Sequence, residues 1–227
     1  TAGSYQNYSY IGALVGFCYG GITNVNLTGA VNFSPLRGKG VGGIVGYFFG
    51  NVEDCDILAD PGSCILANAN NGSTAGFAYY GGIVGYDYAG ENHIAYCDVK
   101  NMEIKACFGV GGIVGKVERS IDLLHNTVEN VSILELTPDG SSQVLTDRYT
   151  PQCGLISGCT TDNNVEQPHV YLNNTYSGTC SVTANGTVVE PVPLYDGWLR
   201  TAMVEPEARI GSEYAGKYHA TLAGAVA

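Results

Sequence analysis

Eight cysteines are the residues of this 227-residue chain with the clearest potential chemistry. They are Cys18, Cys55, Cys64, Cys97, Cys107, Cys153, Cys159 and Cys180. Their number is even and no two form a Cys-x-x-Cys pair, which favours disulfides over a zinc-ribbon or thioredoxin-like site. We therefore expect an oxidising, extracellular compartment and place the protein among secreted chains.

Local spacing favours particular disulfide pairs. The turn residues Asp60, Pro61 and Gly62 lie between Cys55 and Cys64 and favour a bond between those two. Two further pairs are close in sequence: Cys97 with Cys107, and Cys153 with Cys159. Cys18 and Cys180 remain and would meet only if the tail folded back. The alternative is a bond between neighbouring repeats, such as Cys55 with Cys97.

Seven Asn-x-Ser/Thr sequons indicate N-glycosylation, because the chain's own content of these residues predicts fewer by chance. The acceptor residues are Asn7, Asn26, Asn32, Asn71, Asn130, Asn173 and Asn185. Covalent N-glycans point to the eukaryotic secretory pathway. The alternative is that an Asn-rich β-protein carries unused sequons.

Carboxylates are the next candidates for chemistry. Glu53, Asp54 and Asp56 fall in one expected strand, and overlaying the repeats places Asp56 beside Asp98 on the outward face. Stacked carboxylates could bind Ca²⁺ or act in a polysaccharide lyase, or they are ordinary solvated acids. The overlay shows no Arg or Lys nearby to act as the base of a lyase, so the solvated interpretation is favoured.

Histidines and tyrosines give little further evidence for a reaction. The four histidines are His93, His125, His169 and His219. No two occupy matching repeat positions, so we expect no catalytic residue, no metal site and no cofactor. The outward column of the overlay, Asn26, Asp56, Asp98, Thr127 and Asn174, is not a threonine ladder for ice. A tyrosine cluster could stack on sugars or simply pack between strands: Tyr79, Tyr80, Tyr86, Tyr88 and Tyr96.

Composition limits the class of protein. The net charge is −11, and the ten Lys and Arg residues form no basic run, which argues against a nucleic-acid partner. No run approaches the roughly 20 apolar residues that a membrane-spanning helix needs, so no membrane span is expected. Hydrophobic residues make up 45% and charged residues 14%, with 32 glycines and 16 tyrosines, which is typical of an all-β fold rich in turns.

One short repeat explains how these residues are positioned. Its five copies are Gly12-Ala-Leu-Val-Gly16, Gly42-Gly-Ile-Val-Gly46, Gly81-Gly-Ile-Val-Gly85, Gly111-Gly-Ile-Val-Gly115 and Gly154-Leu-Ile-Ser-Gly158. The first glycines are 30, 39, 30 and 43 residues apart, which predicts a unit of about 30 residues with insertions. Stacked units would place Ile44, Ile83 and Ile113 in one column, and the paired glycines would allow close approach.

A second apolar pattern follows each copy. It is Ile22-x-x-Val25-x-Leu27, Val52-x-x-Cys55-x-Ile57, Ile94-x-x-Cys97-x-Val99-x-x-Met102-x-Ile104, Leu123-x-x-Asn126-x-Val128-x-x-Val131-x-Ile133, and Val170-x-x-Asn173-x-Thr175. Steps of two within strands and three across bends predict short strands, not helices. We expect a parallel β-solenoid of about five coils over residues 1–190, with insertions near 58–78 and 134–152, and a cap or subunit-joining segment over 191–227.

The G-x-G-G-I-V-G pattern, followed by a spacer and an I-x-N/D-C-x-V strand, resembles the GLUG-type repeats of secreted and cell-surface proteins over residues 10–180. The resemblance implies a right-handed β-helix and a scaffolding or adhesive role. This chain departs from the family pattern in its irregular spacers, its altered fifth copy and its many sequons. We therefore take from the resemblance only an expectation about the architecture of this chain.

The functional expectation is an extracellular structural protein without enzyme activity. We expect a glycosylated, disulfide-bonded solenoid that is a subunit of a surface layer or self-assembling fibre. The termini, 1–10 and 218–227, are almost free of charge, which favours self-association through them. The alternatives are a carbohydrate-binding adhesin module and a β-helical polysaccharide-degrading enzyme.

Overall fold

The computed structural model describes residues 9–34, 38–67, 79–88, 92–106, 108–119, 121–136, 152–160, 170–184 and 186–195, together with the backbone of 208–210 and 217–219. Regular structure within these residues is entirely β-strand, which confirms the expected all-β class. No described segment forms a helix long and apolar enough to cross a membrane.

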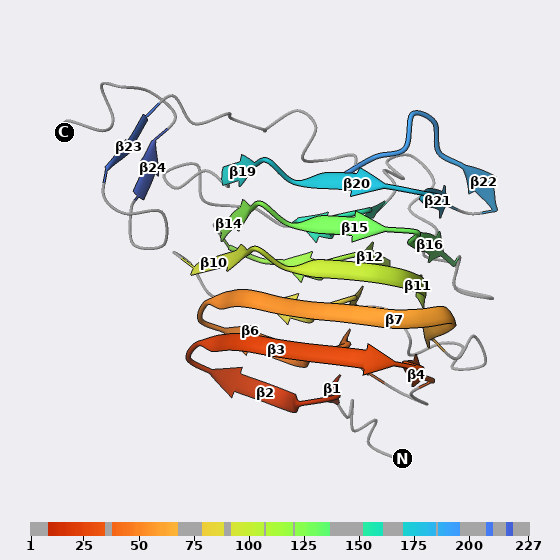
Figure 1. Cartoon of the computed structure of the whole chain (residues 1–227), viewed down its shortest axis with the longest axis horizontal. Helices are drawn as coiled ribbons and strands as arrows, with labels where there is room; N and C mark the ends of the chain where they lie inside the picture. The colour runs from red at the N-terminus through yellow and green to blue at the C-terminus, as the bar shows by residue number, and fades with distance from the viewer. Residues whose placement is uncertain are drawn as a thin grey trace, which may run out of the picture.

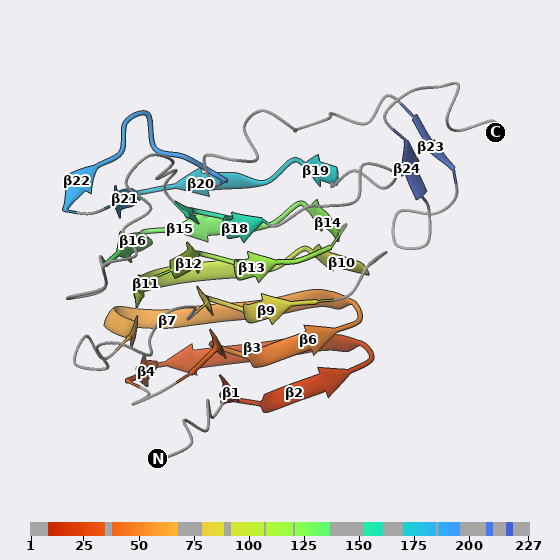
Figure 2. The same ribbon diagram turned by 180° about the vertical axis from the view of Figure 1, so that it is seen from behind.

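Three parallel sheets make up the body of the molecule (Figure 1). Sheet A contains, in spatial order, β1 (Tyr10–Gly12), β5 (Gly40–Gly42), β8 (Tyr79–Gly81), β12 (Phe108–Gly111) and β17 (Cys153–Gly154). Sheet B contains β2 (Val15–Tyr19), β6 (Val45–Phe49), β9 (Val84–Asp87), β13 (Val114–Val117) and β18 (Ser157–Thr160). Sheets A and B lie behind sheet C in Figure 1 and face the viewer in Figure 2.

Sheet C is the largest and forms the front face of Figure 1. Its strands are β3 (Ile22–Gly29), β4 (Asn32–Phe33), β7 (Val52–Leu66), β10 (Asn92–Ala95), β11 (Asp98–Ala106), β14 (Ile121–Leu124), β15 (Thr127–Glu129), β16 (Ser132–Glu135), β19 (Val170–Leu172), β20 (Thr175–Ser177), β21 (Ser181–Ala184) and β22 (Thr187–Val188). A separate antiparallel pair joins β23 (Ala208–Ile210) to β24 (Lys217–His219).

The registers confirm the stacking of the glycine repeats. Gly12 pairs with Gly42, Gly42 with Gly81, Gly81 with Gly111 and Gly111 with Gly154. The chain therefore visits sheets A, B and C in turn and then returns to sheet A. We call each full circuit through sheets A, B and C a pass. The first pass is β1–β4 and the last is β17–β21.

The paired glycines stand at the corner between the strands of sheet A and those of sheet B. A Cβ on Gly43 would overlap both the carbonyl oxygen of Gly82 and the Ile57 side chain of sheet C. Only glycine lets the backbone of one pass approach the next pass and the core this closely. The core lies between the sheets, and Ile44, Ile83 and Ile113 are all buried in it.

Residues with positive φ explain the three-residue steps of the second pattern. One stands between the first and second apolar positions of each pattern: Asn24 (57°), Asp54 (50°), Tyr96 (55°), His125 (55°) and Asn173 (52°). The left-handed conformation bends each chain there and keeps the side chains on both sides of the bend in the core.

The fifth copy of that pattern was misplaced by one residue. Leu123 pairs with Tyr171 and Val128 with Tyr176, so the pattern is Tyr171-x-x-Asn174-x-Tyr176. The buried Asn174 side chain accepts a hydrogen bond from the Asn126 backbone, 3.0 Å away, and this contact selects it over its neighbour Asn173. The outward column consequently continues from Thr127 to Thr175.

Part of the expected insertion near 58–78 is strand. Residues 58–66 belong to β7 and pair with β11. Leu58 pairs with Lys100 and Ser63 with Met102, so residues 59–62 form a bulge opposite Asn101. Residues 68–78 lie outside the described chain, as does most of the expected insertion at 134–152, since β16 extends to Glu135.

Candidate functional site

The two ends of the parallel stack differ. At the last pass, the backbone N–H of Leu155 donates to Pro193 O at 2.9 Å and that of Ile156 to Leu194 O at 2.7 Å. Tyr195 forms a parallel bridge with Ser157 and is buried. Residues 193–195 therefore occupy the place of a further strand over sheets A and B, within the expected segment 191–227.

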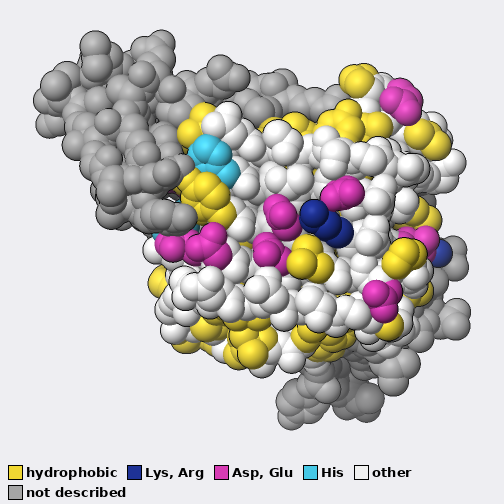
Figure 3. Space-filling model, viewed as in Figure 1, with side chains coloured by type: hydrophobic (Ala, Val, Ile, Leu, Met, Phe, Trp, Pro, Cys, Tyr) yellow, Lys and Arg dark blue, Asp and Glu magenta, His cyan; other side chains and the backbone are white. Residues whose placement is uncertain are grey.

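The first pass has an open edge. In the described chain no strand pairs with the outer side of β1, β2 or β3. Leu14, Phe17 and Tyr19 are 58%, 42% and 73% exposed, although the corresponding side chains of the second pass are more buried. Figure 3 shows hydrophobic side chains along the lower edge of the molecule, near β2 and β3 of Figure 1. We call the unpaired side of β1–β4 the open edge.

The open edge carries no charge. Residues 9–34 contain no Asp, Glu, Lys, Arg or His, and the first charged residue of the whole chain is Arg37. Edge strands of soluble proteins usually carry charges, prolines or bulges that prevent pairing with other molecules. The sequence prediction of uncharged termini covers 1–10 and 218–227, whereas the uncharged segment at the open edge extends to residue 34.

An aromatic row runs along the outer side of sheets A and B and ends at the open edge. Its members are Tyr10, Phe17, Tyr47, Tyr79, Tyr86 and Tyr88. The rings of Phe17 and Tyr47 stack with centroids 4.5 Å apart and planes 5° apart. The sequence marks part of this row, because Phe17, Tyr47 and Tyr86 each follow the last glycine of a repeat.

Cations continue the aromatic row beyond the tyrosines. Lys116 follows the fourth repeat and pairs in register with Tyr86. Its Nζ lies 4.7 Å from the Tyr79 ring centroid and 3.1 Å from a Glu118 carboxylate oxygen. Burial lowers the pKa of the Lys116 ammonium and raises the pKa of Glu118, while their contact offsets the cost of burying both charges. The far end of the row is thus a packed structural element.

The predicted tyrosine cluster divides among three locations. Tyr79 and Tyr86 are buried within the aromatic row, with Tyr88 half-buried beside them, and Tyr80 lies inside the core. Tyr96 is elsewhere and stacks on His125 with centroids 4.8 Å apart. Because the rings of the third repeat are mostly covered, the interpretation as strand packing is favoured over a sugar-binding groove.

The carboxylate column lies on the outer face of sheet C. The Asp98 backbone N–H donates to Asp56 Oδ1 at 3.0 Å, which confirms that these residues are neighbours. Burial raises the pKa of Asp56, and the Asp98 charge adds to this effect. Contrary to expectation, a lysine is present: Lys100 interacts with both carboxylates and is 3.1 Å from Glu129. Figure 3 shows acidic and basic side chains gathered near the middle of this face.

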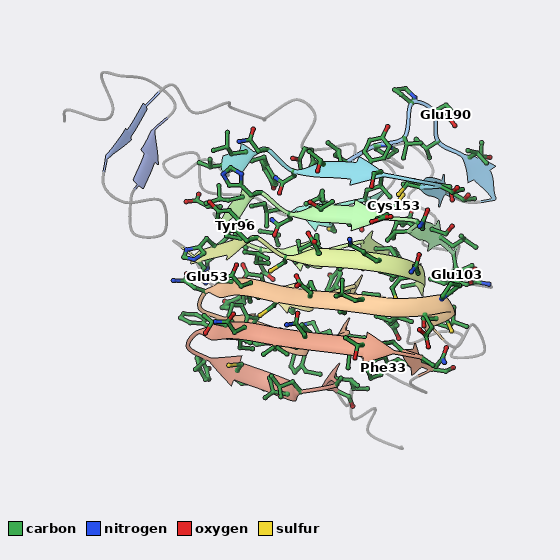
Figure 4. All side chains as sticks on the ribbon, viewed as in Figure 1. Phe33, Glu53, Tyr96, Glu103, Cys153 and Glu190 are labelled. Carbon is green, nitrogen blue, oxygen red and sulfur yellow. The ribbon has the colours of Figure 1, made fainter. Side chains whose placement is uncertain are left out.

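Two histidines lie at one corner of sheet C, near the labelled Glu53 and Tyr96 of Figure 4. His93 contacts the Glu53 carboxylate through Nε2, and His125 stacks on Tyr96. His169 lies outside the described residues, and only the backbone of His219 is described. In the described part of the chain, no three His, Cys, Asp or Glu side chains are arranged to hold a metal ion.

The structure contradicts the favoured bond between Cys55 and Cys64. Both residues lie on β7, where Cys55 is buried in the core and Cys64 is half-exposed beside Asn32. They are nine residues apart in strand conformation, at roughly 3.3 Å a residue, whereas a disulfide needs Cα atoms within about 7 Å. The turn residues between them, Asp60, Pro61 and Gly62, form part of the bulge in β7.

The neighbour of Cys55 is Cys97, as in the alternative pairing. Cys55 lies on β7 and Cys97 at the bend between β10 and β11, and the two side chains interact through a hydrogen bond. Burial holds the pKa of the Cys97 thiol well above its ordinary value. Cys18 belongs to β2 in the first pass and Cys180 precedes β21 in the last, with the intervening passes between them.

Both cysteines of the remaining predicted pair, Cys153 and Cys159, are described, whereas Cys107 is not. Cys153 belongs to β17 and Cys159 to β18, on opposite sides of the corner at Leu155 and Ile156. Cys107 lies outside the described residues, so its predicted bond with Cys97 does as well.

Four of the predicted sequon asparagines are described, and all four are exposed: Asn26, Asn32, Asn130 and Asn173. Asn130 is held between passes, since its Nδ2 donates to Asn101 Oδ1 at 3.1 Å and its Oδ1 accepts from the Thr179 backbone at 2.9 Å. The other three lie outside the described residues: Asn7, Asn71 and Asn185.

Comparisons with protein-family models, curated proteins and solved structures found no match for this chain.

Proposed function

We propose that this chain is an extracellular structural protein that associates with copies of itself to build a surface layer or fibre. Its body would be a right-handed β-solenoid of about five coils, glycosylated at its exposed sequons. Crossovers between parallel strands are almost always right-handed, which supports the handedness. The five-stranded sheets A and B support the coil number.

The observation that carries this proposal is the open edge. A net charge of −11 makes copies of this chain repel one another over most of their surface, yet the first pass has no charged residue. The exposed Leu14, Phe17 and Tyr19 would bury apolar area when the edge is covered. Unpaired strands supply the backbone hydrogen bonds for such a contact.

The carbohydrate-binding alternative has weaker support. Stacking on a sugar requires accessible ring faces, and Tyr79 and Tyr86 are covered by neighbouring rings and by Lys116. The exposed rings of the first pass, Phe17 and Tyr19, lie on β2, which has no described partner strand on its outer side.

The test is electron microscopy and sedimentation of protein secreted from a eukaryotic host, over a range of concentrations and without reducing agent. Assemblies that grow with concentration support the structural role. Monodisperse monomers at every concentration would contradict it and move attention to a glycan panel.

A further inference from the structure

The end of the stack at the last pass is not available for the pairing that the open edge needs. Residues 193–195 already hydrogen-bond to the chain between β17 and β18, and Asn174 Nδ2 donates to the buried Tyr195 hydroxyl at 3.1 Å. Val189, Val192 and Leu194 pack against the core there. In sheet C, β21 is followed by β22, an antiparallel strand that departs from the stacking direction.

Head-to-tail growth would place the open edge of one copy on the last pass of the next. Residues 193–195 would then have to leave sheets A and B, exposing the buried Tyr195 and breaking the backbone hydrogen bonds of Leu155 and Ile156. In the described part of sheet C, the strands at that end without an outer partner are short: β19 and β20 have three residues each, and the antiparallel β22 has two.

We propose that the open edge pairs with the open edge of a second copy, giving a closed dimer related by a two-fold axis perpendicular to the stack. This inference rests on the proposed function, of which it names the partner and the geometry. In such a contact β3, which has eight residues, pairs antiparallel with its own copy. The two cores then become continuous, and the dimer is the unit from which any larger assembly is built.

The side chains of the open edge fit this arrangement. Leu14 is the first-pass neighbour of the buried Ile44, and Phe17 stacks on Tyr47 but remains 42% exposed. A second copy would cover the free sides of Leu14 and Phe17. In a two-fold contact each patch faces an identical patch, so like charges would repel each other. The open edge carries no charge and avoids this repulsion.

The experiment compares two double variants by sedimentation velocity and light scattering on the full glycosylated chain. Leu14→Glu with Tyr19→Glu places charges on the open edge. The matched control, Tyr176→Glu with Val188→Glu, charges side chains that are 45% and 57% exposed at the other end of the stack. Far-UV circular dichroism and thermal unfolding verify that both variants fold.

We expect the wild type and the control to have the mass of two chains and the open-edge variant the mass of one. Loss of the dimer in both variants, or in neither, would overturn the two-fold contact. Polymers that exceed two chains and are broken by the open-edge variant would overturn the closed dimer while the proposed self-association stands. A wild type that remains monomeric would overturn both.

Discussion

Gly82 shows how much of this fold depends on a single missing side chain. A Cβ at this position would overlap the carbonyl oxygen of Gly112 in the next pass and lie 2.9 Å from a methyl group of Val99. Backbone cannot give way as a flexible side chain can, so we expect Gly82→Ala to lower the free energy of unfolding by about 2–4 kcal/mol.

The matched control for this substitution is Gly21→Ala. The nearest atom to a Cβ there is the carbonyl oxygen of Asn51 at 3.8 Å, an ordinary contact. Denaturant unfolding of both variants measures the difference. Equal stabilities would show that the passes can separate to admit a methyl group, contrary to the close packing described above.

Asp122 makes the stability depend on pH. It lies between His93 and Val170 in sheet C, and burial raises its pKa from 3.8 to about 6. The folded state therefore holds this proton more tightly than the unfolded chain does. Its stabilising contribution is complete below about pH 4 and is lost as the pH rises through about 6.

We expect Asp122→Asn to be more stable than the wild type by about 2 kcal/mol at pH 7, because the cost of the buried charge disappears. Near pH 4 the two proteins should unfold at similar denaturant concentrations. Urea titrations between pH 4 and 7 measure this, and a constant difference across the range would assign the effect to packing instead of ionisation.

At the scale of the strands, a column of buried polar side chains joins successive passes. Asn126 Oδ1 accepts from the Cys97 backbone at 3.1 Å, its Nδ2 donates to Ile94 O at 2.8 Å, and Asn174 Nδ2 donates to Leu123 O at 2.7 Å. These bonds satisfy backbone groups at the bends, where the sheet ladder is interrupted.

Asn126→Ala would remove the side-chain partner of the Cys97 N–H and of the Ile94 carbonyl. We expect a loss of about 2–4 kcal/mol, since each unsatisfied group costs about 1–3 kcal/mol. The outward-facing neighbour provides the control: Thr127→Ala removes only a hydroxyl contact of 3.5 Å with Thr175. Thermal unfolding compares the two, and a larger effect at Thr127 would contradict the importance of the buried column.

At the scale of the whole molecule, charge and apolar surface oppose each other in assembly. Two copies, each with a net charge of −11, repel at long range, while the open edge contributes no ion pair. Salt screens the repulsion and leaves the burial of apolar surface in place. Self-association should therefore strengthen several-fold between about 20 mM and 500 mM NaCl, as measured by the dissociation constant in sedimentation experiments. Weakening with salt would indicate ion pairs across the contact, and another surface would have to be sought.

The repeat made much of the architecture predictable. The all-β class, the alignment of the five glycine copies and the proximity of Asp56 and Asp98 follow from spacing, because parallel stacking turns equal positions in the repeat into neighbours in space. The glycines were equally informative, since only a close backbone approach explains them at each corner.

Positions where the repeat is interrupted could not be predicted in the same way. The fifth pattern moved by one residue because Asn173 and Asn174 are identical in type, and only the fold distinguishes them: Asn174 is buried and bonded to Asn126. The spacing of Cys55 and Cys64 suggested a loop, whereas a bulge kept both in one strand with opposite orientations. Spacing along a chain does not determine which face of a strand a side chain occupies once a bulge intervenes.

The sequence by itself determined that this protein is built from stacked parallel strands and that its first 36 residues carry no charge. Only the tertiary structure decided that these facts meet at one surface. It placed residues 193–195 over the last pass and left the outer sides of β1, β2 and β3 without a described partner strand. The reason is physical: a strand edge is satisfied or open according to what lies beside it in space, and that neighbour comes from a distant part of the chain.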